Sequence, residues 1–257
     1  MILAVLSVKL PMSKMTNLSV NLNKVALIRN TRNLGIPSIT KMAQICIDAG
    51  AKGITVHPRP DQRHIRPGDV YDLLDVVKTV EFNIEGNPLE VSFMEIVHQV
   101  KPTQCTLVPD TPDTFTSDSG WDLTKDRERL IPIIQELHSL GSRVSLFMDA
   151  DVQQISLVPD TGAERIELYT EPYATAYREN QNLDAVWQQF AEAAKKAQSL
   201  GLGVNAGHDL NLDNLAKFCT IPGILEVSIG HALTAEALEM GFAQTVKEYL
   251  KILAQST

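Results

Sequence analysis

The chain has 257 residues, of which 44% are hydrophobic and 21% charged, with a net charge of -8 and a pI near 5.3. This composition is that of a globular protein with a full core, and its acidic balance argues against a nucleic-acid-binding protein, which would need a basic face. No apolar run approaches the roughly 20 residues that span a bilayer, and Cys46, Cys105 and Cys219 match no C-x-x-C spacing, which indicates reduced thiols in a cytoplasmic protein.

Residues 1–16 precede the first predicted strand. They have no charge before their apolar stretch and no clear A-x-A cleavage site, so they do not match a secretory signal. We interpret them as an N-terminal extension, with Met12 or Met15 as alternative starts. Residues 17–257 are expected to form a single domain, because no linker or change in composition divides them.

Short β-rich runs recur along this domain. Most are apolar on both faces, which is typical of strands covered by helices. In chain order they span residues 18–22, 53–57, 81–85, 104–108, 143–148, 165–170, 202–206 and 224–230.

The segments between these runs carry helix signals. One predicted helix begins after Pro37-Ser38 and ends at Gly50, a second ends at Gly141 with Pro132 as an internal kink or restart, and a third ends at Gly201. A last helix over 234–254 closes the chain. Strand–helix units repeated eight times in about 250 residues predict an α/β fold, a (β/α)8 TIM barrel with extra short helices. The alternative, an open doubly wound sheet, lacks a G-x-G-x-x-G motif after the first strand.

Polar residues gather where these runs end, and in a barrel this end carries function. Four of the six histidines lie at or just past the end of a run: His57, His64, His208 and His231. Glu85 and Glu167 place carboxylates on predicted strands, which costs several kcal/mol unless the group is paired or functional. We expect His57, Glu85, Glu167 and His208 to converge on one mouth and to transfer protons.

The segments "NAGHD" and "SIGHAL" follow the seventh and eighth runs, where barrels commonly bind phosphate. Gly230 allows close approach of the backbone, and a helix from about Ala232 would direct its free N–H groups at an anion. Arg32, Arg59 and His64 supply positive charge elsewhere around the mouth. Two separated basic groups indicate two phosphate subsites.

A metal site is the main alternative for the four proton-transfer residues, because two histidines and two glutamates can ligate zinc. No H-x-H or H-E-x-x-H spacing occurs, and Lys24 nearby would repel a cation. We expect no metal, and a metal-dependent barrel lyase or hydrolase acting on a phosphorylated sugar is the second hypothesis.

Several motifs together are highly specific: "VNLNKVALIRNTR", "GITVHPRPDQRHI", "FNIEGNP", "LVPD", "SLFMDAD", "IELYT", "VNAGHDL" and "SIGHAL". From about Asn17 to its C-terminus, the chain resembles the pyridoxine 5′-phosphate synthase family of deoxyxylulose-phosphate-dependent vitamin B6 biosynthesis. The resemblance implies a homo-octameric barrel that joins 1-deoxy-D-xylulose 5-phosphate to 3-amino-2-oxopropyl phosphate. It also implies that the ring closes with release of phosphate and water, without metal or organic cofactor.

The resemblance implies roles for the matched residues. His57 and Glu85 would accept protons, His208 would donate one, and Glu167 would stabilise charge. The implied contacts to deoxyxylulose phosphate are Arg59, His64 and Thr116. The implied contacts to the amino-ketone phosphate are Asn21, Arg32, Gly230 and His231.

Three polar residues depart from the family pattern: Asn23, Lys24 and Asp209. Many members read N-I-D-H where this chain reads N-L-N-K over 21–24, and many have glycine in place of Asp209. Substrate contact is still expected for Asn23 and Lys24, and for Asp209 through its backbone N–H. A paralogue that binds phosphorylated sugars without closing the ring is the third hypothesis. The segment 86–102 or 110–122 is expected to act as a lid.

Overall fold

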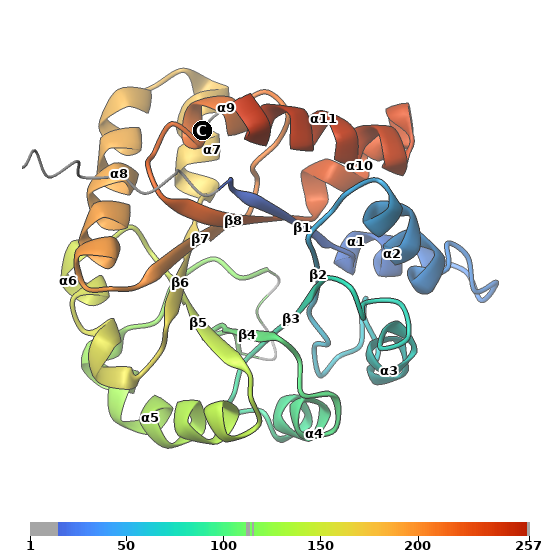
Figure 1. The fold of residues 1–257 in the computed structure, drawn as a ribbon, viewed down its shortest axis with the longest axis horizontal. Helices are drawn as coiled ribbons and strands as arrows, with labels where there is room; N and C mark the ends of the chain where they lie inside the picture. Colours follow the sequence, from blue (N-terminus) through green and yellow to red (C-terminus); the bar gives the residue numbers. More distant parts are fainter. Residues whose placement is uncertain (1–14, 112–113, 115, 256–257) are drawn as a thin grey trace, which may run out of the picture.

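The computed structural model describes residues 15–111, 114 and 116–255. Eight parallel strands form a closed barrel in chain order, with β8 paired to β1 (Figure 1). The strands are β1 (Asn17–Asn21), β2 (Gly53–Val56), β3 (Glu81–Gly86), β4 (Gln104–Leu107), β5 (Arg143–Met148), β6 (Arg165–Tyr169), β7 (Gly203–Gly207) and β8 (Ile224–Ile229). The predicted (β/α)8 barrel is confirmed, and each strand lies within one residue of its predicted bounds at both ends. The predicted N-terminal extension falls almost entirely outside the described residues.

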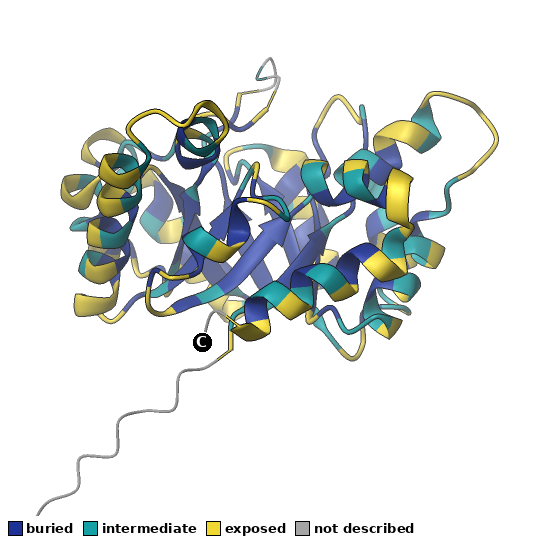
Figure 2. Cartoon of the chain, turned by 90° about the horizontal axis from the view of Figure 1, so that it is seen from above, coloured by how far each residue is buried: buried dark blue, intermediate teal, exposed yellow. Residues whose placement is uncertain are grey.

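Helices surround the barrel, with buried inner faces and exposed outer faces (Figure 2). They are α1 (Asn23–Asn30), α2 (Ile39–Asp48), α3 (Pro67–Leu73), α4 (Val91–Val100), α5 (Leu123–Ser139), α6 (Val152–Ile155), α7 (Glu171–Glu179), α8 (Leu183–Ser199), α9 (Leu215–Phe218), α10 (His231–Met240) and α11 (Phe242–Gln255), with a 3₁₀ helix at Val158–Thr161. The predicted stops at Gly50, Gly141 and Gly201 coincide with positive φ angles of 113°, 85° and 81°. Glycine adopts this conformation without steric cost.

The structure corrects one helix prediction and excludes one of the two alternatives for Pro132. The closing segment is two helices instead of one, because Gly241 has a φ of 81° and ends α10 before α11 begins. Helix α5 contains Pro132 without a restart, since it runs unbroken from Leu123 to Ser139. Helix α1 follows β1 at once, where only polar residues of the mouth were expected.

The barrel interior is polar, and β1 shows how the strands produce this. Leu18 and Val20 point outward and belong to the hydrophobic core between strands and helices. The alternate residues, Ser19 and Asn21, point inward and hydrogen-bond to Thr55 and Glu85. The outward residues are apolar because they pack against the helices. The inward residues are also buried, but they carry polar side chains that hydrogen-bond to one another across the barrel.

The inward side chains form hydrogen-bonded groups at different depths. At the N-terminal end of the barrel, Arg143 and Arg165 join a network of acids and amides comprising Glu81, Gln104, Asn205 and Glu226. Further along the strands, hydrogen bonds connect Ser19, Thr55, Asn83, Thr106 and Glu167. The C-terminal ends of the strands form the open mouth.

The three cysteines are buried and form no disulfide, as expected from their spacing. Within the described ranges, every helix is too short or too polar to cross a membrane.

Candidate active site

The mouth brings Asn21, His57 and Glu85 together from the ends of β1, β2 and β3. The Asn21 amide Nδ2 donates to Glu85 Oε2 over 3.2 Å, and His57 Nδ1 lies 3.8 Å from the same oxygen. His57 and Glu85 are buried, with exposed fractions of 5% and 8%. The predicted convergence of His57 and Glu85 is therefore confirmed for this pair.

Burial changes the protonation of both members of this pair. Removal from water, with a further contribution from the charge of Asp110, raises the pKa of Glu85 to about 7. Burial also lowers the pKa of His57 well below its ordinary value, and the nearby Arg59 adds to this effect. Near neutral pH, Glu85 exchanges protons readily, which suits it to general base catalysis, and His57 is in the neutral form that can accept a proton.

Asn23 positions the mouth through its side chain. Its Oδ1 accepts a hydrogen bond from the His57 backbone N–H over 2.9 Å, and its own backbone N–H donates to Asn21 Oδ1 over 2.9 Å. The side-chain oxygen of Asn23 therefore ties the start of α1 to the end of β2. The amide N–H groups of Asn23 are not used by these two bonds and could serve the substrate contact that the resemblance implied.

Glu167 lies deeper than the other candidates. It is 1% exposed, and its Oε2 accepts from Thr106 Oγ1 over 3.3 Å. Burial and the nearby charges of Glu85 and Glu226 raise its pKa well above the ordinary value. Glu167 is therefore held toward its protonated form in the interior, beneath the mouth rather than at its surface.

His208 follows β7 in an uncommon backbone conformation. Its φ is 79°, and the φ of Asp209 is 55°, so two consecutive non-glycine residues are left-handed. The His208 ring packs against Phe147 and Tyr169, with centroids 5.3 and 5.4 Å away. Glycine adopts a left-handed φ without steric cost, and aspartate tolerates it better than most other residues. The Asp209 side chain is exposed.

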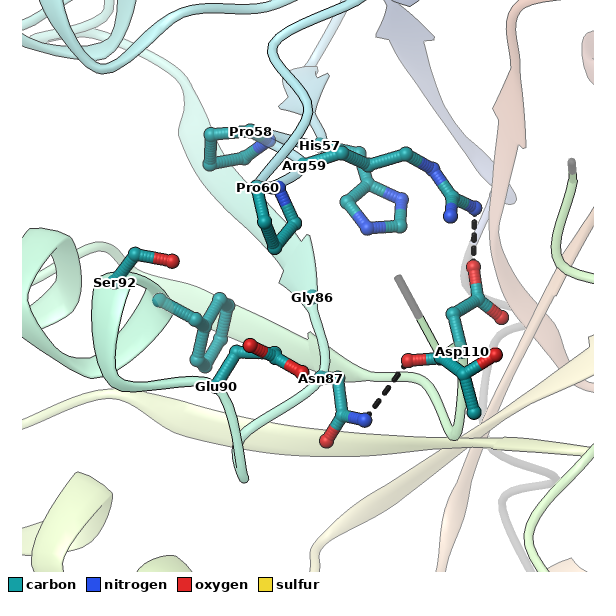
Figure 3. Close-up of a pocket in the computed structure, with 11 residues that line it drawn as sticks. His57, Pro58, Arg59, Pro60, Gly86, Asn87, Glu90, Ser92 and Asp110 are labelled. Carbon is teal, nitrogen blue, oxygen red and sulfur yellow. Dashed lines mark hydrogen bonds and ion pairs between the residues drawn. The ribbon is translucent and has the colours of Figure 1, made fainter. Parts of the chain in front are cut away.

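Arg59 lies over the mouth on the loop after β2 and is paired with an acid that the sequence analysis did not single out. Its Nη2 forms an ion pair with Asp110, which follows β4, and lies 3.4 Å from Ser117 Oγ. Its Nη1 donates to the Thr114 carbonyl over 3.1 Å. Figure 3 shows the side chain extending across the pocket toward Asp110. Both partners of the ion pair are buried.

His64 and Lys24 lie close to this guanidinium. The ring of His64 is 6.1 Å from that of His57, and its Nδ1 accepts from the Ile65 backbone N–H over 2.9 Å. Burial and Arg59 lower the pKa of His64 to about 4. This pKa favours the neutral ring near pH 7, which offers a hydrogen bond from Nε2. The positive charge expected on His64 stays a prediction. Burial and Arg63 lower the pKa of Lys24.

Other expected substrate contacts lie farther out. Gly230 lies beside Asn21, because a Cβ on Gly230 would be 3.1 Å from the Asn21 side chain. Helix α10 begins at the next residue, His231, which is exposed. Arg32 is exposed in the turn after α1, and Thr116 is exposed on the segment after β4. Within the described ranges, the side chains of Arg32 and Thr116 make no hydrogen bond to the residues of the mouth.

Asp110 and Ser117 are the site residues that the sequence analysis missed. Asp110 ends the quoted motif "LVPD", three residues beyond β4, so a search for polar residues after strands had the signal to find it. Ser117 had no such signal, because it contacts the site only through the path of its loop.

Metal ligation was the alternative use of these side chains. In residues 15–111, 114 and 116–255, no group of three or more His, Cys, Asp or Glu side chains is arranged to hold a metal ion.

Comparisons with known proteins agree on one family. The family model described as "Pyridoxal phosphate biosynthesis protein PdxJ" matches residues 18–255. A curated protein named pyridoxine 5′-phosphate synthase from Albidiferax ferrireducens is 55% identical over 93% of this chain and 98% of its own length. One of the same name from Porphyromonas gingivalis is 50% identical over 93% and 100%.

Solved structures of low identity share the fold. A phosphoribosylanthranilate isomerase from Thermotoga maritima matches with a TM-score of 0.59 and 12% identity, covering 94% of this chain and 100% of its own. A tryptophan synthase chain from M. tuberculosis matches with a TM-score of 0.61 and 11% identity, covering 93% and 94%. These likenesses concern the barrel alone.

Proposed function

The chain belongs to the PdxJ family of pyridoxal phosphate biosynthesis proteins, and from this we infer that it is an enzyme that synthesises pyridoxine 5′-phosphate. The substrates in this proposal are 1-deoxy-D-xylulose 5-phosphate and 3-amino-2-oxopropyl phosphate. They are small, carry one phosphate each, and need neither a metal nor an organic cofactor to react.

The reaction consists largely of proton transfers. The amine of one substrate attacks the ketone of the other, water and phosphate leave, and a carbon–carbon bond closes the ring. Each step needs a base or acid that works near neutral pH. The observation that carries the proposal is the pair His57 and Glu85, with a 3.8 Å separation and a Glu85 pKa of about 7.

His208 is the proposed proton donor. Burial lowers its pKa and favours the neutral ring, whereas the charges of Asp209 and Asp110 act in the opposite direction. Two bound phosphates would add negative charge and raise the pKa of His208 further. The ring would then take up a proton when substrate binds and release it to a leaving group. In this scheme Glu167 stabilises charge from beneath the reacting atoms.

The two phosphates are assigned to opposite parts of the mouth. Arg59 and His64 on the loop after β2 would hold deoxyxylulose phosphate, with Lys24 and Thr116 as further contacts. The first residues of α10, with Gly230 and His231, would hold the amino-ketone phosphate together with Asn21 and Arg32. The N-terminal N–H groups of α10 support this, because they favour an anion.

Assembly and location complete the proposal. We place the enzyme in the cytoplasm, which the three buried, unpaired thiols support. We expect a homo-octamer, as the family resemblance implies, and sedimentation of the purified protein measures this.

Incubation of the purified enzyme with both substrates tests the function. Pyridoxine 5′-phosphate and inorganic phosphate should appear in equal amounts, and a chelator should leave the rate unchanged. Loss of activity with the chelator and its return with one added metal would favour the metal-dependent alternative. Binding of both substrates without product would favour the paralogue.

A further inference from the structure

Asp110 is a buried acid that the proposed chemistry does not use. Its carboxylate pairs with the Arg59 guanidinium and also accepts from Ser117 Oγ over 2.6 Å. The Asn87 amide donates to its backbone carbonyl over 2.8 Å, which fixes the segment after β4 to the end of β3 (Figure 3). Asp110 is therefore anchored through both its backbone and its side chain.

The pairing leaves part of Arg59 available. A guanidinium has five N–H donors in a planar fork. Nη2 faces Asp110 and Ser117, and one Nη1 hydrogen is used by the Thr114 carbonyl. No acceptor for Nε–H is present among the described residues, so Nε–H and the second Nη1 hydrogen remain for a ligand.

Holding an arginine in this way has a physical effect on binding. A free arginine side chain loses rotamer entropy when it is fixed on a ligand, and a fork fixed in advance loses less. A buried guanidinium without a partner would also be costly, so a carboxylate on one edge lets the charge stay at the mouth before substrate arrives.

We propose that Asp110 is a positioning residue of the substrate site, whose carboxylate fixes the Arg59 guanidinium so that its remaining N–H donors bind the phosphate of the deoxyxylulose substrate. Ser117 and the Thr114 carbonyl complete the clamp. The inference rests on the proposed function, because that function makes Arg59 a phosphate ligand.

Asp110 also acts on the proton-transfer groups through its charge. Glu85 contacts Asn21 and lies near His57. Its pKa also responds to the charges of Asp110, Arg59 and Glu226. Glu167 lies close enough for the charge of Glu85 to raise its pKa. The pKa of His208 responds to the charges of Asp209, Asp110, Arg59 and Lys24. The Asp110 charge raises the pKa of both Glu85 and His208, so its removal shifts both limbs of the pH–rate profile to lower pH.

The test is Asp110→Asn, which keeps the shape and an acceptor oxygen but removes the charge. The KM for deoxyxylulose phosphate should rise about tenfold, which corresponds to ~1.4 kcal/mol of binding. The KM for the amino-ketone phosphate should stay unchanged, and the pH–rate profile should shift as described. Asp118→Asn removes a charge from the same segment at an exposed position and should change none of these values.

A second comparison shows whether Asp110 acts through Arg59. In an Arg59→Met background, Asp110→Asn should cause no further rise in KM, because the group it holds is gone. An equal rise in both backgrounds would overturn the proposal. So would a fall in KM for Asp110→Asn, which would mean that Asp110 competes with the phosphate.

Folding and function are checked separately. If Asp110→Asn does not fold, Ser117→Ala removes one member of the clamp and should raise the same KM by a smaller factor. Calorimetric titration of each variant with deoxyxylulose phosphate measures binding without turnover. Wild-type protein that makes no product contradicts the proposed function, whereas wild-type activity with normal binding by the variants contradicts only the role of Asp110.

Discussion

At the scale of single residues, burial decides what each titratable group of the mouth can do. Glu85, His57 and His64 are ordinary side chains whose pKa values are all shifted toward the neutral form by loss of water. The neutral form of the two histidines is favoured, and the glutamate becomes a base that titrates near pH 7. Sequence alone gives the residue types, but not these protonation states.

Glu85→Gln should lower turnover by about a hundredfold or more, because it removes a general base and keeps the size of the side chain. It should also raise the Tm at pH 8. The folded protein holds the Glu85 proton up to about pH 7, whereas the unfolded chain releases it near 4.5, so stability falls as the pH rises through this window. Kinetics and thermal unfolding at pH 5 and 8 measure both effects, and near-normal turnover would remove Glu85 from the mechanism.

His208→Asn should fold normally, because asparagine tolerates the left-handed φ of 79° at this position. Substrate binding should persist and product formation should fall strongly, since asparagine cannot deliver the proton. Calorimetry and turnover separate the two. A lower Tm with normal turnover would show that the ring serves only to pack against Phe147 and Tyr169.

Lys24→Met should raise the KM for deoxyxylulose phosphate, whereas Lys24→Arg should keep substantial activity, because the charge and its hydrogen bonds matter. The Lys24 charge lowers the pKa of His208, so Lys24→Met should also move the alkaline limb of the profile upward. Borohydride added with the substrate should trap nothing on Lys24. A reduced adduct found by mass spectrometry would require a Schiff base instead.

At the scale of elements, glycines with positive φ set where several helices end. Gly241 separates α10 from α11, and its φ of 81° allows α10 to stop after ten residues. The N-terminus of α10 lies at Gly230, beside Asn21.

Gly241→Ala should lower stability by about 1 kcal/mol, because an alanine at this φ is strained. A Cβ at Gly241 meets no atom within 4 Å, so backbone conformation is the only cause. Gly68→Ala in α3 is the matched control, since its Cβ also meets nothing and its backbone is helical. Urea unfolding should show Gly68→Ala unchanged or stabilised. Equal effects of the two variants would contradict this reason.

At the scale of the whole molecule, buried carboxylates of similar pKa serve opposite ends of the barrel. Burial raises the pKa of Glu226 to about 7, as it does for Glu85, but Glu226 belongs to the network with Arg165 and Asn205 at the closed end. Burial is the main cause of both shifts, but the charged neighbours differ: Asp110 and Arg59 act on Glu85, whereas Glu81 and Arg165 act on Glu226.

Glu226→Gln should therefore weaken the fall in stability between about pH 4.5 and 7, as Glu85→Gln does, because both remove a carboxyl whose folded-state pKa is raised. Unlike Glu85→Gln, it should leave turnover unchanged. Thermal unfolding across pH, measured beside turnover, compares the two variants. Loss of turnover in Glu226→Gln would show that the closed end is coupled to the chemistry.

The sequence by itself determined the barrel, the bounds of its strands and the residues at their C-terminal ends, because these depend on local periodicity and on a topology that brings all such ends to one mouth. It also led to His57, Glu85, Glu167 and His208 as one group. Only the tertiary structure decided that Glu167 lies beneath the mouth, that burial lowers the pKa of His64, and that Asp110 and Ser117 hold Arg59. Depth, pKa and ion pairing depend on which side chains approach from distant parts of the chain and how much water they exclude, and neither quantity is written in local sequence.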